Sequence, residues 1–142
     1  MVTAQGADHT TGNIPAFVCD GKTTAELTEA SLDIQALCAA ADSLGLCLFG
    51  RSVTNVQLDF MVEALNNAHG TELDASFYLQ IGYEALRYEW AFNKEAGFTE
   101  KDDELPAFFY DEALHPTGKT ARHHTAEVNL HMRKLMDQQL TQ

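Results

Sequence analysis

The chain has 142 residues, of which 45% are hydrophobic, so it is long enough and apolar enough to fold around one core. Nine Lys and Arg residues against 21 Asp and Glu residues give a formal net charge of −12. That charge repels nucleic acid and anionic membrane surfaces, so neither is expected as a partner. No apolar run approaches the roughly 20 residues of a membrane-spanning helix, and no secretory signal is visible at the N-terminus, so we expect a cytoplasmic location.

The first predicted element follows an irregular segment. Residues 1–22 are rich in Gly, Thr, Asp and Asn, which is typical of loops. Thr23 and Glu26 have the spacing of a capping box at the start of a helix. Gly45 can adopt the left-handed conformation that ends one, so we expect a helix over residues 24–44. Apolar residues recur along it at the spacing of one helical face: Leu27, Ala30, Ile34, Leu37, Ala41 and Leu44.

Two further helices are predicted in the middle of the chain. The sequence TNVQ at residues 54–57 resembles a second capping box and predicts a helix that ends near Gly70. Asp74 can cap a third and longer helix over residues 75–97. This third helix is apolar around so much of its circumference that we expect neighbours on more than one side.

The C-terminal part is predicted to alternate between turns and short helical segments. A charged turn, TEKDDELP, precedes the aromatic run AFFYDEAL, and the loop HPTGKTARHH leads to a final helix from about Thr125 to Gln139. No β alternation of useful length is present. We therefore predict a single all-α domain, a bundle of about four helices, with its main helical region at 23–114 and a loop plus terminal helix at 115–142.

The end of the first helix is the first candidate site. Asp42 in the last turn faces the negative end of the helix dipole, where a cation would be favoured. A carboxylate there can accept two parallel N–H bonds from a pterin or guanine edge, and a nearby Cys47 thiolate would favour a cation such as iron. The alternative is a solvated aspartate before an ordinary terminating glycine, with Cys47 as a small buried residue. One Asp and one Cys do not by themselves make a metal site.

Histidines and the other cysteines supply weaker candidates. His9, in the loop sequence GADHTTG, is either a proton donor or metal ligand, or an ordinary surface histidine. His123 and His124 are adjacent, so we expect them to point to different sides of a solvated loop. Cys38 faces the predicted core and is expected to pack there. The odd number of cysteines, with Cys19 as the third, argues against a disulfide framework.

One further pair of residues has a spacing known from metal sites. Glu112 and His115 have the i, i+3 spacing of a di-iron carboxylate helix. That architecture needs a second such pair, which the sequence lacks, and Pro116 indicates a helix end. A di-iron bundle is therefore not expected.

Two of these segments together resemble one family. The sequence DSLGLC at 42–47, followed by YEWAFNKEAGFTEKDDELPAFF at 88–109, is similar to the C-terminal domain of the tungsten- or molybdenum-pterin aldehyde ferredoxin oxidoreductases. That family carries D-x-x-G-L-C in its last third, then a helix ending F-N-x-x-A/E-G-F-T and a D-D-x-L-P turn. The resemblance covers about residues 5–115 and implies a helical domain.

The resemblance assigns roles to individual residues. It implies that Asp42 binds a pterin of the metal cofactor and that the backbone at Leu46 lies against the same pterin. Cys47 matches the last of four ligands to a [4Fe–4S] cluster. His9 matches a histidine near the metal that is a proposed proton donor. The Asp42 carboxylate at its unfavourable helix end would then be compensated by pterin N–H groups.

The activity implied is the two-electron oxidation of a small aldehyde to a carboxylic acid, with electrons passing through the pterin and the cluster to ferredoxin. The family's N-terminal β-rich domain, first D-x-x-G-L motif and C-x-x-C-x-x-x-C ligands are not found in the sequence. We therefore expect a C-terminal piece that is inactive alone and needs the N-terminal portion, or a separate subunit, of the same enzyme. The alternative is a stand-alone helical interaction module without a cofactor.

Overall fold

The computed structural model describes residues 3, 4, 6, 8, 10–12, 14 and 16–139. These residues form no strand, and Leu114 and Lys119 make an isolated β-bridge. The prediction of an all-α chain with an irregular N-terminal segment is confirmed. Within the described residues the helical elements, in chain order, are α1 (Thr24–Ser43), the 3-10 helix η1 (Leu48–Gly50), α2 (Arg51–Thr54), α3 (Leu58–His69), α4 (Ser76–Glu95), α5 (Phe108–Asp111) and α6 (Thr125–Gln139).

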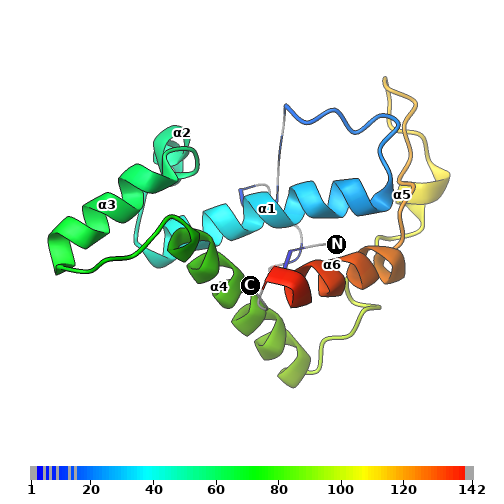
Figure 1. Cartoon of the computed structure of the whole chain (residues 1–142). Helices are drawn as coiled ribbons and strands as arrows, with labels where there is room; N and C mark the ends of the chain where they lie inside the picture. Colours follow the sequence, from blue (N-terminus) through cyan, green and yellow to red (C-terminus); the bar gives the residue numbers. More distant parts are fainter. Residues whose placement is uncertain are drawn as a thin grey trace.

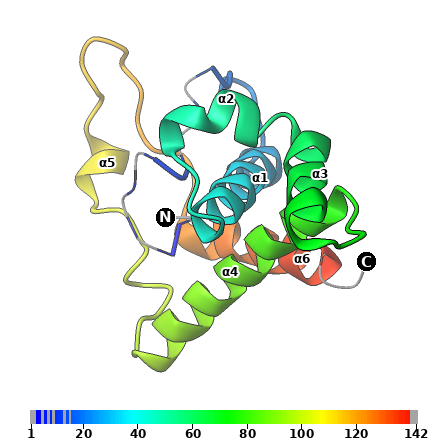
Figure 2. The same cartoon turned by 90° about the vertical axis from the view of Figure 1, so that its left-hand side faces the viewer.

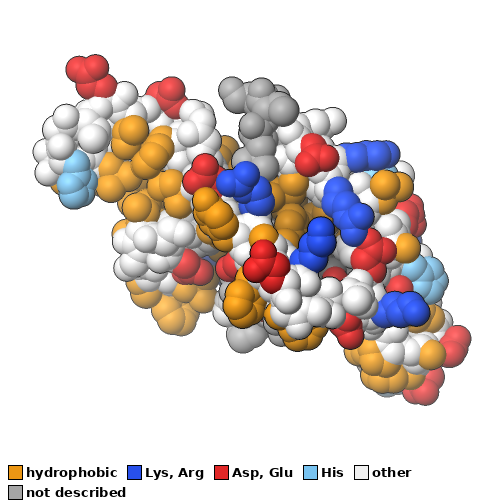
Figure 3. Space-filling view, turned by 90° about the horizontal axis from the view of Figure 1, so that it is seen from below, with side chains coloured by type: hydrophobic (Ala, Val, Ile, Leu, Met, Phe, Trp, Pro, Cys, Tyr) orange, Lys and Arg blue, Asp and Glu red, His pale blue; other side chains and the backbone are white. Residues whose placement is uncertain are grey.

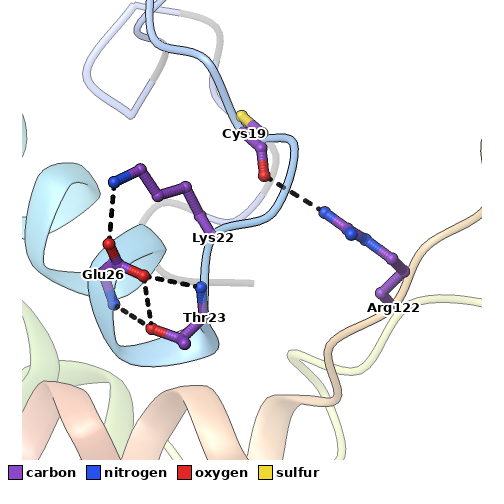
Figure 4. Close-up of polar contacts among 5 residues, drawn as sticks. All are labelled: Cys19, Lys22, Thr23, Glu26 and Arg122. Atoms are coloured by element: carbon purple, nitrogen blue, oxygen red, sulfur yellow. Dashed lines mark hydrogen bonds and ion pairs between the residues drawn. The ribbon is translucent and has the colours of Figure 1, made fainter.

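The capping box at the start of α1 is present as predicted. The backbone N–H of Glu26 donates to Thr23 Oγ1 at 3.3 Å, and the backbone N–H of Thr23 donates to Glu26 Oε2 at 2.9 Å (Figure 4). Lys22 adds an ion pair with Glu26 at 2.8 Å. The same view shows Arg122 donating to the Cys19 carbonyl at 3.3 Å, which links the segment before α1 to the loop before α6.

Gly45 ends α1 in the left-handed conformation, as predicted, and the hydrogen bonds around it form a Schellman motif. Gly45 has a φ of +68°, its N–H donates to the Asp42 carbonyl, and the Leu46 N–H donates to the Ala41 carbonyl, both at 2.9 Å. The chain therefore turns sharply away from the helix at Gly45, after the last helical residue Ser43 and the C-cap Leu44. Leu46 and Cys47 directly follow this turn and therefore lie close to the C-terminal end of α1.

The predicted helix starts of α3 and α4 had different outcomes. The capping box predicted at 54–57 is wrong: α3 begins at Leu58, and Thr54 is the buried last residue of α2. The reason is that residues 48–54 are already helical, so the Thr54 hydroxyl bonds the Asn55 side chain at 3.0 Å instead of a helix N-terminus. For α4 the N-cap residue is Ala75, which makes no side-chain cap, and Asp74 lies directly before it with its carboxylate accepting from the Ser76 N–H at 2.8 Å.

Helices α1 and α4 form the centre of the molecule (Figures 1 and 2). Helix α1 makes its most extensive contacts with α4 and the next most extensive with α6. Gly82 of α4 lies against α1 so closely that a Cβ there would stand 1.9 Å from the Ala36 carbonyl oxygen. Helix α4 also contacts α3 and α6, which confirms the expectation of neighbours on more than one side.

Two apolar clusters hold this arrangement. One joins α1, α4 and α6 and consists of buried Leu32, Ala36, Tyr83, Leu86, Val128, Met132 and Met136. The other joins α1, α3 and α4 through Ala40, Val62 and Tyr78. Both clusters draw on α1 and α4, so the second half of α1 is fixed against α4. No helix among the described residues combines the length and apolar character needed to cross a membrane.

The loop before α6 differs from its prediction. His123 is half-buried, and its Nδ1 lies 2.7 Å from the hydroxyl of buried Thr24. The expectation of a solvated loop is therefore wrong for His123, which joins this loop to the first turn of α1. His124 is exposed and stacks on Tyr110 with ring centroids 4.4 Å apart.

Candidate functional site

The candidate site is a small cavity between the end of α1 and the middle of α4. Its volume is about 90 Å³. Gln35, Asp42 and Ser43 reach it from α1, and Glu89 reaches it from α4. Thr3 and Thr11 of the N-terminal segment complete its polar lining. Asp42, the first candidate residue from the sequence, therefore lines a cavity of the structure.

The Asp42 carboxylate is electrostatically unfavourable where it stands. Asp42 is exposed in the last turn of α1. The residues of this turn are all described by the structure, and none of them is basic. The carbonyl ends of a helix repel a negative charge by roughly 0.3–1 kcal/mol when it is exposed. A ligand that donates hydrogen bonds would relieve this repulsion.

Glu89 places a second carboxyl group at the same cavity. Burial, and after it the negative charge of Asp42, raise the pKa of Glu89 above its ordinary value. The two carboxyl groups come from different helices, and the negative charge of Asp42 disfavours the ionisation of Glu89. The cavity therefore has a negative potential that favours a proton, a cation or an N–H donor.

Gln35 contributes an acceptor that is not used within the protein. Its side chain is 1% exposed, and its Nε2 donates to Ser31 Oγ at 3.1 Å. Its Oε1 is buried without a hydrogen-bond partner among the described residues. A buried acceptor in that condition costs about 1–3 kcal/mol, so a donor supplied by a ligand would be stabilising.

Leu46 and Cys47 follow Asp42 around the Schellman turn. The Leu46 N–H is already bonded to the Ala41 carbonyl, so this residue has its carbonyl and its half-buried side chain left for a ligand. Cys47 is a free, exposed thiol directly before η1. The alternative of a small buried residue is therefore wrong for Cys47, whereas Cys38 is buried as predicted.

The metal-ligating capacity of the described residues is small. They contain no group of three or more His, Cys, Asp and Glu side chains that could hold a metal ion. Cys47 can therefore supply at most one thiolate of the four that a [4Fe–4S] cluster takes. His9 lies outside the described residues, so its predicted role remains a prediction.

Gln35 and Glu89 were missed in the sequence, although a signal was present. Gln35 precedes Asp42 by seven residues, which is two helical turns, so both lie on the same side of α1. Glu89 lies in the segment YEWAFN, whose aromatic residues indicate packing and not a polar site. The sequence signal for a binding site was therefore Gln35, a polar residue two helical turns before Asp42 on the same side of the helix.

A larger open hollow adjoins the cavity on α4. It has a volume of about 470 Å³ and is lined by Tyr88, Glu89, Phe92 and Asn93 together with Ala4. Tyr88 and Phe92 are 64% and 70% exposed, and Asn93 Nδ2 donates to the Ala4 carbonyl at 2.7 Å. Glu89 thus lies between the small cavity that also contains Asp42 and the open hollow that exposes aromatic side chains.

Comparison with known proteins identifies one family. A family model described as "Aldehyde ferredoxin oxidoreductase, domains 2 & 3" matches residues 1–139. No curated protein and no solved structure matches the chain.

Proposed function

The chain belongs to the aldehyde ferredoxin oxidoreductase family, and on this premise we propose that it seats a metal–pterin cofactor and contributes one thiolate to a [4Fe–4S] cluster. The reaction proposed is the oxidation of a small aldehyde to a carboxylic acid, with ferredoxin as the electron acceptor. The observation that carries the proposal is the exposed Asp42 carboxylate at a cavity whose buried Gln35 acceptor has no partner among the described residues.

Asp42 is proposed to bind the pterin. A carboxylate accepts two parallel N–H bonds, and charge-assisted bonds of this kind are about twice as strong as neutral ones. Ligand N–H groups would also offset the repulsion between Asp42 and the carbonyl end of α1. The Leu46 backbone would lie against the same ligand through its carbonyl, since its N–H bonds the Ala41 carbonyl.

Cys47 is proposed as one ligand of the cluster. Its thiol is exposed and free, so no rearrangement of the core is needed for it to bind iron. The other three thiolates would come from the N-terminal portion, or a separate subunit, of the same enzyme. The chain on its own is therefore expected to be inactive.

A bound tungsten- or molybdenum-bis-pterin would supply the two-electron chemistry. Overall, an aldehyde and one water give a carboxylic acid, two protons and two electrons, and the electrons leave to ferredoxin.

His9 is proposed to handle one of these protons. We expect His9→Ala to lower turnover while cofactor content stays unchanged, and normal turnover in that variant would remove its catalytic role.

The test is anaerobic co-expression with a polypeptide that carries the family's C-x-x-C-x-x-x-C ligands, followed by measurement of iron per complex. Cys47→Ala should lose iron. Cys19→Ala is the matched control, because Cys19 is also free and exposed, and it should retain iron. Equal iron content in the wild type and Cys47→Ala would defeat the ligand assignment.

A second candidate function is a stand-alone helical interaction module without a cofactor. Exposed apolar side chains would serve such a module, among them Phe49, which is 94% exposed, and Phe60 on α3, which is 60% exposed. Figure 3 shows that hydrophobic side chains reach one face of the molecule in several groups. A complex that assembles stably but contains neither iron nor pterin would support this candidate over the enzyme.

A further inference from the structure

We infer that Glu89 of α4 and Gln35 of α1 act together with Asp42 as binding residues for the amino-substituted edge of a pterin ring. This inference rests on the proposed function, because it names the partners of Asp42 within the same seat. It adds two residues outside the D-x-x-G-L-C sequence. The inference is based on the observation that Glu89, Gln35 and Asp42 line the same cavity.

The chemistry of the lining points to a ligand that donates hydrogen bonds. Asp42 and Glu89 present carboxyl oxygens, and the unpartnered atom of Gln35 is its carbonyl oxygen. Gln35 is the independent observation here, because it is 1% exposed and cannot satisfy its acceptor from bulk water. Three acceptors around a cavity of about 90 Å³ match an edge with several N–H groups in a row.

A metal ion is a poorer occupant of the same cavity. The described residues offer no group of three or more side chains of the types that hold metals, and a glutamine oxygen is a neutral ligand. The edge of a pterin, by contrast, carries a ring N–H beside an exocyclic amino group. These donors lie in one plane, so that one carboxylate can accept two of them while the third N–H reaches another acceptor.

Glu89 lines both the small cavity and the open hollow next to it, so it can contact the edge of a bound pterin and lie close to the rest of its ring. It lines the small cavity together with Asp42, and it also lines the open hollow where Tyr88 and Phe92 expose their aromatic faces. The Asn93 bond to the Ala4 carbonyl fixes the N-terminal segment against this side of α4. A ring system whose edge enters the cavity would thus have aromatic surface next to it.

The test is a fluorescence titration of the full chain with pterin and with lumazine, which has an oxo group in place of the amino group. Wild type should bind pterin at least about tenfold more tightly than lumazine, a difference of roughly 1.4 kcal/mol. Glu89→Gln and Gln35→Met should each weaken pterin binding by about tenfold. Glu84→Gln removes an exposed carboxylate from the same helix and should bind as wild type.

The outcomes separate this inference from the function on which it rests. Equal binding of pterin by wild type and Glu89→Gln, with weaker binding by Asp42→Asn, would overturn the roles given to Glu89 while the function stands. Equal affinity for pterin and lumazine, or no binding of either by wild type, would overturn the inference entirely. The proposed function would then depend on the iron measurement with Cys47→Ala alone. Unchanged far-ultraviolet circular dichroism shows that each variant is folded.

Discussion

Gly82 of α4 lies directly against the carbonyl oxygen of Ala36 on α1, so closely that the two helices leave no room there for a Cβ. A helical glycine costs about 1 kcal/mol relative to alanine, so its presence reflects the close approach that it allows. Asp42 and Glu89 follow Ala36 and Gly82 on the same two helices. The crossing therefore sets the distance between the two walls of the candidate site.

Gly82→Ala is expected to destabilise the fold. An added Cβ would stand 1.9 Å from a backbone oxygen, so the helices must separate. Overpacking of this kind costs typically 1–3 kcal/mol, and here it outweighs the better helix propensity of alanine. Urea unfolding measures the change. Gly50→Ala is the control, because its Cβ would meet the Thr54 methyl at an ordinary 3.8 Å, and similar midpoints for both variants would contradict the account.

Gly45→Ala should also lower stability, for a different reason. A Cβ at residue 45 meets nothing within 4 Å, but its φ of +68° is unfavourable for alanine. The expected loss is about 1–2 kcal/mol of unfolding free energy. Gly45→Asn should lose less, since asparagine tolerates this conformation better. Equal stability of the alanine variant and the wild type in thermal unfolding would show that the turn adjusts without strain.

Glu89→Gln should raise stability in a manner that depends on pH. The pKa of Glu89 is raised in the folded chain by burial and by Asp42, so the folded state binds its proton more tightly than the unfolded state. Stability contributed by that proton is present below the ordinary pKa of 4.5 and is lost as pH rises through the folded value. The variant should therefore be more stable than wild type at pH 7, and this advantage should vanish near pH 4.

The matched variant for that comparison is Glu84→Gln on the exposed side of α4. Because Glu84 is exposed and does not line the cavity, its stability difference from wild type should change less between pH 7 and pH 4 than that of Glu89→Gln. If the two variants show the same pH dependence, the effect does not come from the cavity. Chemical unfolding at a series of pH values gives both differences directly.

Gln35→Met should separate stability from binding. Methionine is similar in shape to glutamine and removes the unpartnered acceptor, at the cost of the Nε2 bond to Ser31. Since a satisfied hydrogen bond contributes about 1 kcal/mol and an unsatisfied acceptor costs about 1–3 kcal/mol, unfolding free energy should stay level or rise. A loss of more than about 2 kcal/mol would indicate that Gln35 holds the core and does not serve a ligand.

Much of this architecture was predictable from local sequence signals. Thr23 with Glu26 and the glycines at 45 and 70 act through bonds or backbone angles within a few residues, so their patterns identified helix ends correctly. The start of α3 was missed because Thr54 ends α2, a helix of 4 residues that is too short to show a periodic sequence pattern. His123 was misjudged for a similar reason, since its partner Thr24 is 99 positions away.

The candidate site shows the same division. Asp42 was found because a carboxylate at a helix C-terminus breaks a local rule. Glu89 and Gln35 obey local rules, and what distinguishes them is the crossing of α1 and α4, which only the fold reveals. Cys47 has no other metal-ligating side chains grouped with it among the described residues, so its assignment as a cluster ligand remains a prediction.

The most direct test of the account is the amount of pterin released from the anaerobically purified complex when Asp42 is replaced. Asp42→Ala should lose bound pterin while the helical circular dichroism signal is unchanged. Asp59→Ala, which removes an exposed carboxylate from α3, should keep it. Pterin content in Asp42→Ala equal to that of the wild type would show that the end of α1 does not hold the cofactor.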